Sequence, residues 1–119
     1  MDQYISNILF ILNGKEIDDF NTFEEDARVI RKEVKLMGKT GVMGVSPSYG
    51  FTLGYVIPAN KPEVDFEGVE DGTAIIEMEN GSRITFTGVN TIEIGSTKFD
   101  GEKEATKDIK FVAGKRIKE

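Results

Sequence analysis

Residues 73–87 constrain the fold more than any other segment, because two β-favouring runs flank an Asn-Gly pair, a strong signal for a hairpin. A two-residue loop would mix polar and apolar side chains on each face of this hairpin. A three-residue loop over 79–81, with Gly81 in the left-handed conformation, sets Ile76 opposite Ile84 and gives one buried face. We therefore predict an antiparallel hairpin in this register.

The same pattern of strand, turn and strand recurs along the chain. Near its start, the apolar run at 8–12 is followed by an Asn-Gly pair and by a short β-favouring run at 15–17, which predicts a second hairpin. Three further segments, 50–57, 89–94 and 106–112, alternate apolar and polar residues as half-buried strands do. We expect an antiparallel β-sandwich or barrel of about seven strands.

Two segments favour helix on local grounds. Over residues 20–37, apolar side chains fall at intervals of three and four, which is the pattern of an amphipathic helix. Residues 61–68 predict a single helical turn, with Pro62 in its first turn and Glu63 and Asp65 near its N-terminus. The expected class is therefore mainly β with one short helix, formally α+β.

The segment 38–50 combines many glycines with apolar residues. Glycine lets a loop bend freely, whereas apolar side chains outside a core usually need another surface to cover them. We predict a flexible arm over 38–50, with flexible termini that include residues 1–7, which becomes ordered on a neighbouring subunit. The predicted interface residues are Val42, Met43, Val45 and Tyr49.

The absence of histidine and cysteine excludes most catalytic and metal-binding classes. Without His, the commonest general base and transition-metal ligand are missing, and without Cys there is no disulfide, thiolate zinc site or thiol nucleophile. The Asp and Glu clusters lack the spacing of a calcium loop, and Gly38-Lys39-Thr40 lacks the earlier glycine of a phosphate-binding loop. We predict no enzymatic activity, no metal and no cofactor.

The length and the hydropathy pattern predict a single domain over 1–119. The longest apolar run, at 8–12, is far shorter than the roughly 20 residues that span a bilayer. The first residues also lack the basic region and long apolar stretch of a secretory signal. We therefore expect synthesis in the cytoplasm and no membrane partner.

Charge is distributed unevenly along the chain, whose formal net charge is −6. Acidic residues dominate 1–26 and 61–80, and basic residues dominate 28–39 and 103–118. Patches of opposite sign let one subunit meet a different surface of the next, as in a head-to-tail ring, although they could equally be solvated faces of a monomer. The net negative charge opposes tight, sequence-independent binding of DNA.

The order of these motifs over nearly the whole chain resembles that of phage tail tube proteins, from phages, prophages or phage-like particles. The resemblance rests on strand order and turn motifs rather than on a catalytic signature. The segments that carry it are Asn13-Gly14-Lys15-Glu16, Thr22-Phe23-Glu24, Val34-Lys35-Leu36-Met37-Gly38, Asp100-Gly101-Glu102 and Ile109-Lys110-Phe111.

This resemblance implies a strand rather than a helix across residues 20–37, and six-subunit rings that stack into a hollow tube. It implies sheath, tape measure and baseplate proteins as partners, and an acidic lumen that passes DNA or effectors without binding them specifically. The alternatives are a baseplate or tail-terminator component of related fold, and a monomeric ligand-binding β-module. The type of particle, the presence of a contractile sheath and the oligomeric state in isolation are left open by the residues.

Overall fold

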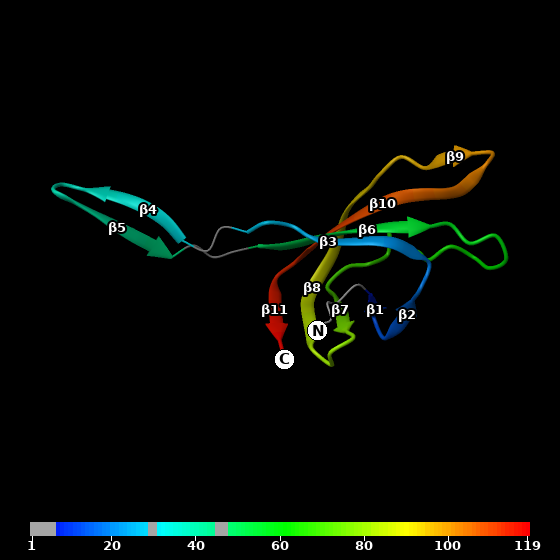
Figure 1. Ribbon diagram of the computed structural model, residues 1–119, viewed down its shortest axis with the longest axis horizontal. Coiled ribbons are helices and arrows are strands. Elements are labelled where there is room, and N and C mark those ends of the chain that lie inside the picture. The colour runs from blue at the N-terminus through cyan, green and yellow to red at the C-terminus, as the bar shows by residue number, and fades with distance from the viewer. Residues whose placement is uncertain (1–6, 29–30, 45–47) are drawn as a thin grey trace, which may run out of the picture.

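A computed structural model describes residues 7–28, 31–44 and 48–119, and every regular element in these ranges is a β-strand. Figure 1 shows a body of crossing strands with one long hairpin that projects from it. The strands are β1 Ile8–Leu12, β2 Lys15–Ile17, β3 Phe20–Glu25, β4 Arg31–Leu36, β5 Lys39–Gly44, β6 Tyr49–Val56, β7 Gly72–Met78, β8 Arg83–Ile94, β9 Lys98–Asp100, β10 Lys103–Ala113 and β11 Lys115–Lys118.

The body is built on one antiparallel path, β2-β1-β7-β8-β10-β6-β3, with β11 paired to β8 and β9 paired to β10. The first half of β8 pairs with β7 and β11, and its second half pairs with β10. The path therefore forms two layers that share β8: β2-β1-β7-β8-β11 and β8-β10-β6-β3. In Figure 1, β3 and β6 run across the strands of the first layer at a steep angle.

β8 bends at two bulges, which explains how one strand serves both layers. Gly88 has no opposite residue on β7 and has a positive φ of 65°, a conformation that glycine adopts without strain. Ile92 is the extra residue opposite β10, between Thr91 and Glu93. The bulges redirect the strand, and the apolar faces of its two halves then enclose one core.

Aromatic side chains fill the space between the layers. Phe51 is fully buried, and its ring centroid lies 4.8 Å from that of Phe86, 4.9 Å from Phe111 and 6.2 Å from Phe10. These rings come from four different strands, so the aromatic cluster joins both layers. The alternation predicted for 50–57 is confirmed, since Phe51, Leu53 and Tyr55 are all buried.

Both predicted Asn-Gly hairpins are confirmed. Ile76 pairs with Ile84, and Gly81 has a φ of 87°, as the three-residue loop requires. The first hairpin has a two-residue loop in which Asn13 and Gly14 both have positive φ, at 52° and 80°.

Two expectations about secondary structure are corrected, and one alternative that the residues left open is settled. The short helix predicted at 61–68 is wrong: within the described residues there is no helix, and this segment crosses the end of the body without regular structure. It is held there because the Tyr55 hydroxyl accepts a hydrogen bond from the Val64 N–H (3.1 Å) and Phe66 packs against the Tyr55 ring (4.9 Å). The strand that the resemblance implies across residues 20–37 is confirmed, since β3 and β4 lie there and the alternative helix is absent from the described residues. The strands of the described ranges number eleven rather than about seven.

Candidate assembly surfaces

The first candidate surface is the β4–β5 hairpin. Its strands pair in register from Arg31 opposite Gly44 to Leu36 opposite Lys39, and the turn at the tip contains Gly38 with a φ of 82°. Within the described residues, these two strands pair with no other strand. Figure 1 shows the hairpin standing clear of the body, along the longest of the molecular extents of 64 × 39 × 29 Å.

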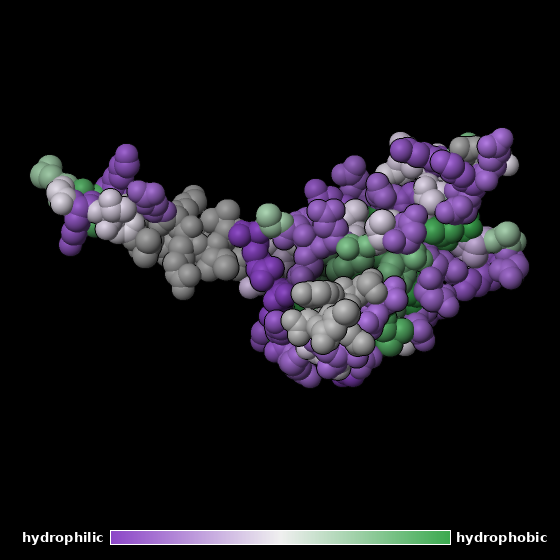
Figure 2. All heavy atoms as spheres, viewed as in Figure 1, coloured by the Kyte–Doolittle hydropathy of each residue, from purple (hydrophilic) through white to green (hydrophobic). Residues whose placement is uncertain are grey.

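The hairpin tip exposes apolar side chains to solvent. Leu36 is 49% exposed and Met37 is fully exposed, and Figure 2 shows apolar residues at the far end of the hairpin. A two-stranded hairpin is only marginally stable on its own in water, and its unpaired edges can bond to another strand. Residues 31–39 also hold four basic side chains against Glu33 alone. The hairpin is therefore a basic projection with an uncovered apolar end.

The structure divides the four predicted interface residues. Val42 and Met43 lie on β5, and therefore on the hairpin. Val45 lies outside the described residues. Tyr49 begins β6 at the base of the hairpin, where it is half-buried against the core and its ring lies 5.6 Å from the Arg28 guanidinium carbon. The interface role of these four residues stays a prediction.

Sequence reasoning missed Leu36 and Met37, because the helical spacing of residues 20–37 assigned them to one amphipathic element. A signal was available in the sequence. Gly38 interrupts the apolar spacing just after Met37, and glycine is a common marker of a turn. Reading that turn would have placed the exposed tip at these two residues.

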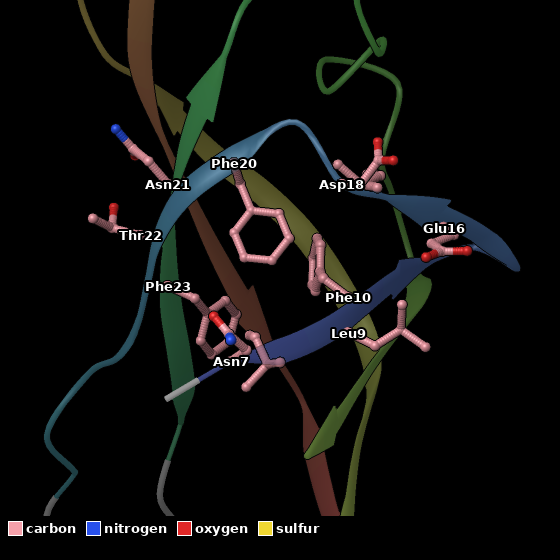
Figure 3. A pocket seen from close by; sticks show the side chains of 11 residues that line it. Asn7, Leu9, Phe10, Glu16, Asp18, Phe20, Asn21, Thr22 and Phe23 are labelled. Atoms are coloured by element: carbon pink, nitrogen blue, oxygen red, sulfur yellow. The ribbon is translucent and has the colours of Figure 1, made fainter. Parts of the chain in front are cut away.

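The second candidate surface is a groove where the β1–β2 hairpin meets β3, which we call the seam groove. It has a volume of about 480 Å³. Figure 3 shows the rings of Phe10, Phe20 and Phe23 between β1 and β3. The centroids of Phe20 and Phe23 lie 6.1 and 5.8 Å from that of Phe10, and both rings are only half-buried. The residues that line the groove are Asn7, Ile8, Leu9, Phe10, Glu16, Ile17, Asp18, Phe20, Asn21, Thr22 and Phe23.

The rim of the seam groove is acidic. Glu16 and Asp18 lie at its β2 end (Figure 3), and no Lys or Arg is among the described residues that line it. Nearby, the Lys61 ammonium lies 2.8 Å from the Asp19 carboxylate and 3.7 Å from that of Asp18. The hydrogen bond to Asp19 raises the pKa of Lys61 above its ordinary value. Lys61 is half-exposed, and its pairing with Asp18 partly offsets the negative charge at that end of the rim.

The base of the hairpin is joined to the C-terminal strand by ion pairs. The Arg116 side chain on β11 donates to the two carboxylate oxygens of Glu25 on β3, at 2.9 and 3.4 Å. Arg28 lies 3.8 Å from the same carboxylate. This contact links the two layers at the point where the chain leaves the body for the hairpin.

The carboxylate clusters noted in the sequence do not form a metal site within the described part of the chain. No group of three Asp or Glu side chains there is arranged to hold an ion. Within the same ranges, no helix is long and apolar enough to span a bilayer.

Chains of solved structures from a contractile injection system and from the anti-feeding prophage have the same fold as this chain. A chain of the extracellular contractile injection system PVC, in its sheath/tube terminator structure in the extended state, superposes with a TM-score of 0.77 and 16% identity, over 100% of this chain and 97% of that one. The anti-feeding prophage cap, a tube terminating cap, gives 0.75 and 14%, over 100% and 93%. The PVC sheath-tube complex in the extended state gives 0.72 and 17%, over 94% and 87%.

No family model and no curated protein sequence matches the chain. At these low identities, the structural likeness establishes the fold. In two of the comparisons it covers 100% of this chain and more than 90% of the other, so the aligned region includes the projecting hairpin. The chain therefore has the fold of components of phage-tail-like injection particles.

Proposed function

We propose that this protein is a structural subunit of a phage-type tail tube, which assembles into hexameric rings that stack into a hollow tube. The observation that carries the proposal is the β4–β5 hairpin. It projects from the body, pairs with no other strand in the described part of the chain, and exposes Leu36 and Met37 at its tip. A second copy of the chain would cover these residues and pair the free edges.

The distribution of charge supports head-to-tail contact between copies. The hairpin is basic, whereas Glu16 and Asp18 make the β1–β2 side of the body acidic. Surfaces of opposite sign on one subunit attract each other in adjacent copies and orient them. The proposed role needs no catalysis and no cofactor, and it accounts for a chain that lacks both His and Cys.

Within such a particle, the partners would be further copies of the chain together with sheath, tape measure and baseplate proteins. The net charge of −6 suits a channel through which DNA or an effector moves without being held, because like charges repel along the lumen. The subunit would be made in the cytoplasm of the bacterial host and built into a virion tail or phage-like particle.

A tube terminator or cap is the second candidate function. Two of the similar structures favour it, since they are described as a sheath/tube terminator and as a tube terminating cap. The two roles differ in how rings associate. A tube subunit has two ring faces that bind each other and forms long stacks, whereas a cap stops at one ring or a short stack.

The test is electron microscopy of the purified protein over a range of concentrations, with its mass measured by light scattering. Hollow tubes support the tube subunit, and single rings or pairs of rings support the terminator. A mass of one chain at every concentration, with no ring on the grids, contradicts self-assembly. The salt dependence of assembly gives a further check, because contacts between opposite charges weaken as ionic strength rises.

A further inference from the structure

We infer that the seam groove is the receptor for the β4–β5 hairpin tip of a second copy. This inference rests on the proposed self-assembly and adds the surface that receives the hairpin. The groove cannot be filled by the hairpin of its own chain in this conformation. None of the described side chains of β4 or β5 lines the groove, and Figure 1 shows the hairpin projecting away from the body.

The apolar parts of the two surfaces are complementary. The tip offers two unbranched or singly branched side chains, Leu36 and Met37, which can adapt to an irregular cavity. The groove offers the exposed faces of Phe20 and Phe23 over the buried ring of Phe10. Its volume of about 480 Å³ falls within the roughly 300–1,000 Å³ range of concave binding sites.

The charges next to these apolar parts are also complementary. Lys35 and Lys39 are exposed on either side of the hairpin turn. Glu16 and Asp18 stand on the groove rim, with no lining cation among the described residues. Exposed ion pairs contribute little free energy each, but they select the partner and its orientation. The tip would therefore enter with its lysines toward the β2 end of the groove.

The backbone offers a third complementary feature. β3 is the last strand of its layer, so its outer edge is unpaired within the described part of the chain, and β4 and β5 each have an unpaired edge. An extended segment can add to such an edge by main-chain hydrogen bonds, while its side chains occupy adjacent pockets. Pairing a hairpin strand of one copy with β3 of the next would satisfy the β3 edge and one of the two hairpin edges.

A head-to-tail contact of this kind uses different surfaces on the two copies. Each copy would donate one hairpin and receive another, so the contact can propagate into a ring or a stack, and it closes at two copies only if they exchange hairpins reciprocally. The geometry therefore predicts one hairpin-to-groove contact for every subunit in the assembly.

Cysteine cross-linking tests the contact directly, because the natural chain has no cysteine to give background products. A tagged Met37→Cys variant is mixed with an untagged Asn7→Cys variant, whose cysteine lies in the groove, and the assembled fraction is oxidised. A disulfide requires Cα atoms about 4.4–6.8 Å apart. The control is Lys118→Cys on β11, at the edge of the first layer opposite β2. We expect Met37→Cys to form a reducible disulfide-linked hetero-dimer with Asn7→Cys, in a yield at least fivefold higher than with Lys118→Cys.

Charge reversal gives a second test that does not depend on a new covalent bond. Glu16→Lys and Lys39→Glu should each raise the protein concentration needed for assembly by roughly two- to fivefold. A chain that carries both substitutions should assemble at the concentration of the natural protein. Glu67→Lys is the matched control, because Glu67 is exposed and does not line the groove. Unchanged urea midpoints for the monomers would show that the variants still fold.

The outcomes separate this inference from the proposed function. Assembly of the natural protein, with preferential Asn7 cross-linking and restored assembly in the charge-swapped variant, supports both. Normal assembly with equal cross-linking at Asn7 and Lys118 overturns the inference and leaves the tube subunit intact, with the groove occupied by another segment or protein. A natural protein that stays monomeric at all concentrations overturns the proposed function and the inference together.

Discussion

Replacing Gly88 with alanine should destabilise the fold through backbone conformation alone. Gly88 has a φ of 65° at the bulge where β8 passes from one layer to the other. A Cβ at this position would lie 3.5 Å from the Gly114 nitrogen and 3.7 Å from an Asp71 carboxylate oxygen, which are ordinary contact distances. The cost therefore comes from the left-handed conformation, at about 1–2 kcal/mol for an L-residue.

That free energy corresponds to a fall in melting temperature of roughly 3–12 °C for a chain of this size. Gly114→Ala is the matched control, since Gly114 lies beside Gly88, lacks a positive φ, and would bring its Cβ no closer than 3.9 Å to any neighbour. Gly88→Asn should lose less than Gly88→Ala, because asparagine tolerates the left-handed region better. Thermal and urea unfolding of the monomer measure all three variants.

Equal melting temperatures for Gly88→Ala and Gly114→Ala would refute this reasoning, and the bend of β8 would then need another cause. A loss for Gly88→Asn as large as that for Gly88→Ala would point to a steric clash instead of a conformational cost. We expect the natural protein and Gly114→Ala to be equally stable, Gly88→Asn to be less stable, and Gly88→Ala to be the least stable.

Three further predictions address the Arg116–Glu25 ion pair, the Tyr55–Val64 hydrogen bond and the hairpin. The free energy of unfolding of Arg116→Met, of Glu25→Gln and of the double variant should give a coupling free energy of about 1 kcal/mol, which falls as the salt concentration rises. If the effects of the two substitutions simply add, the ion pair is not stabilising. Tyr55→Phe should cost roughly 0.5–1.5 kcal/mol in urea unfolding, because the Val64 N–H loses its acceptor, and an unchanged midpoint would argue against that bond. Met43→Asp should block assembly seen by light scattering at an unchanged unfolding midpoint, and normal polymerisation would show that the hairpin is not an interface.

The parts of the fold that could be predicted from the sequence are those that local chemistry determines. Gly81 and the Asn13-Gly14 pair specify their turns through positive φ, and a turn of known length determines the register of the strands beside it. The alternation over 50–57 specifies a buried face because β6 lies in the middle of its layer. In these segments, residues near one another in the chain carry all the information that is needed.

The helical interpretation of residues 20–37 failed for a specific structural reason. Phe20 pairs with Tyr55 and Thr22 with Gly54, so Asn21 is an extra residue in β3. This shift sets Phe20 and Phe23 on the same inward face with a spacing of three instead of two. A bulge therefore gave a strand the period of a helix, and only pairing with β6, which is distant in sequence, distinguishes the two.

The candidate site was partly predictable for a different reason. The glycines and apolar residues over 38–50 indicated a segment whose apolar side chains need another surface to cover them. Half of the hairpin, however, lies before Gly38, in residues whose apolar spacing favoured a helix. The seam groove had no sequence signal at all, because Phe20 and Phe23 look like ordinary core residues. Their partial exposure arises only where the β1–β2 hairpin meets the last strand of the other layer.

The hairpin and the seam groove together suggest why this chain leaves part of its apolar surface uncovered. A subunit that buried Leu36, Met37 and the faces of Phe20 and Phe23 within itself would be more stable alone, but it would have no apolar contact left for assembly. Exposed apolar patches on a lone chain also promote aggregation, and the net charge of −6 opposes this by repulsion between monomers. Stability of the monomer is thus limited by the same residues that, in this proposal, join it to its neighbours.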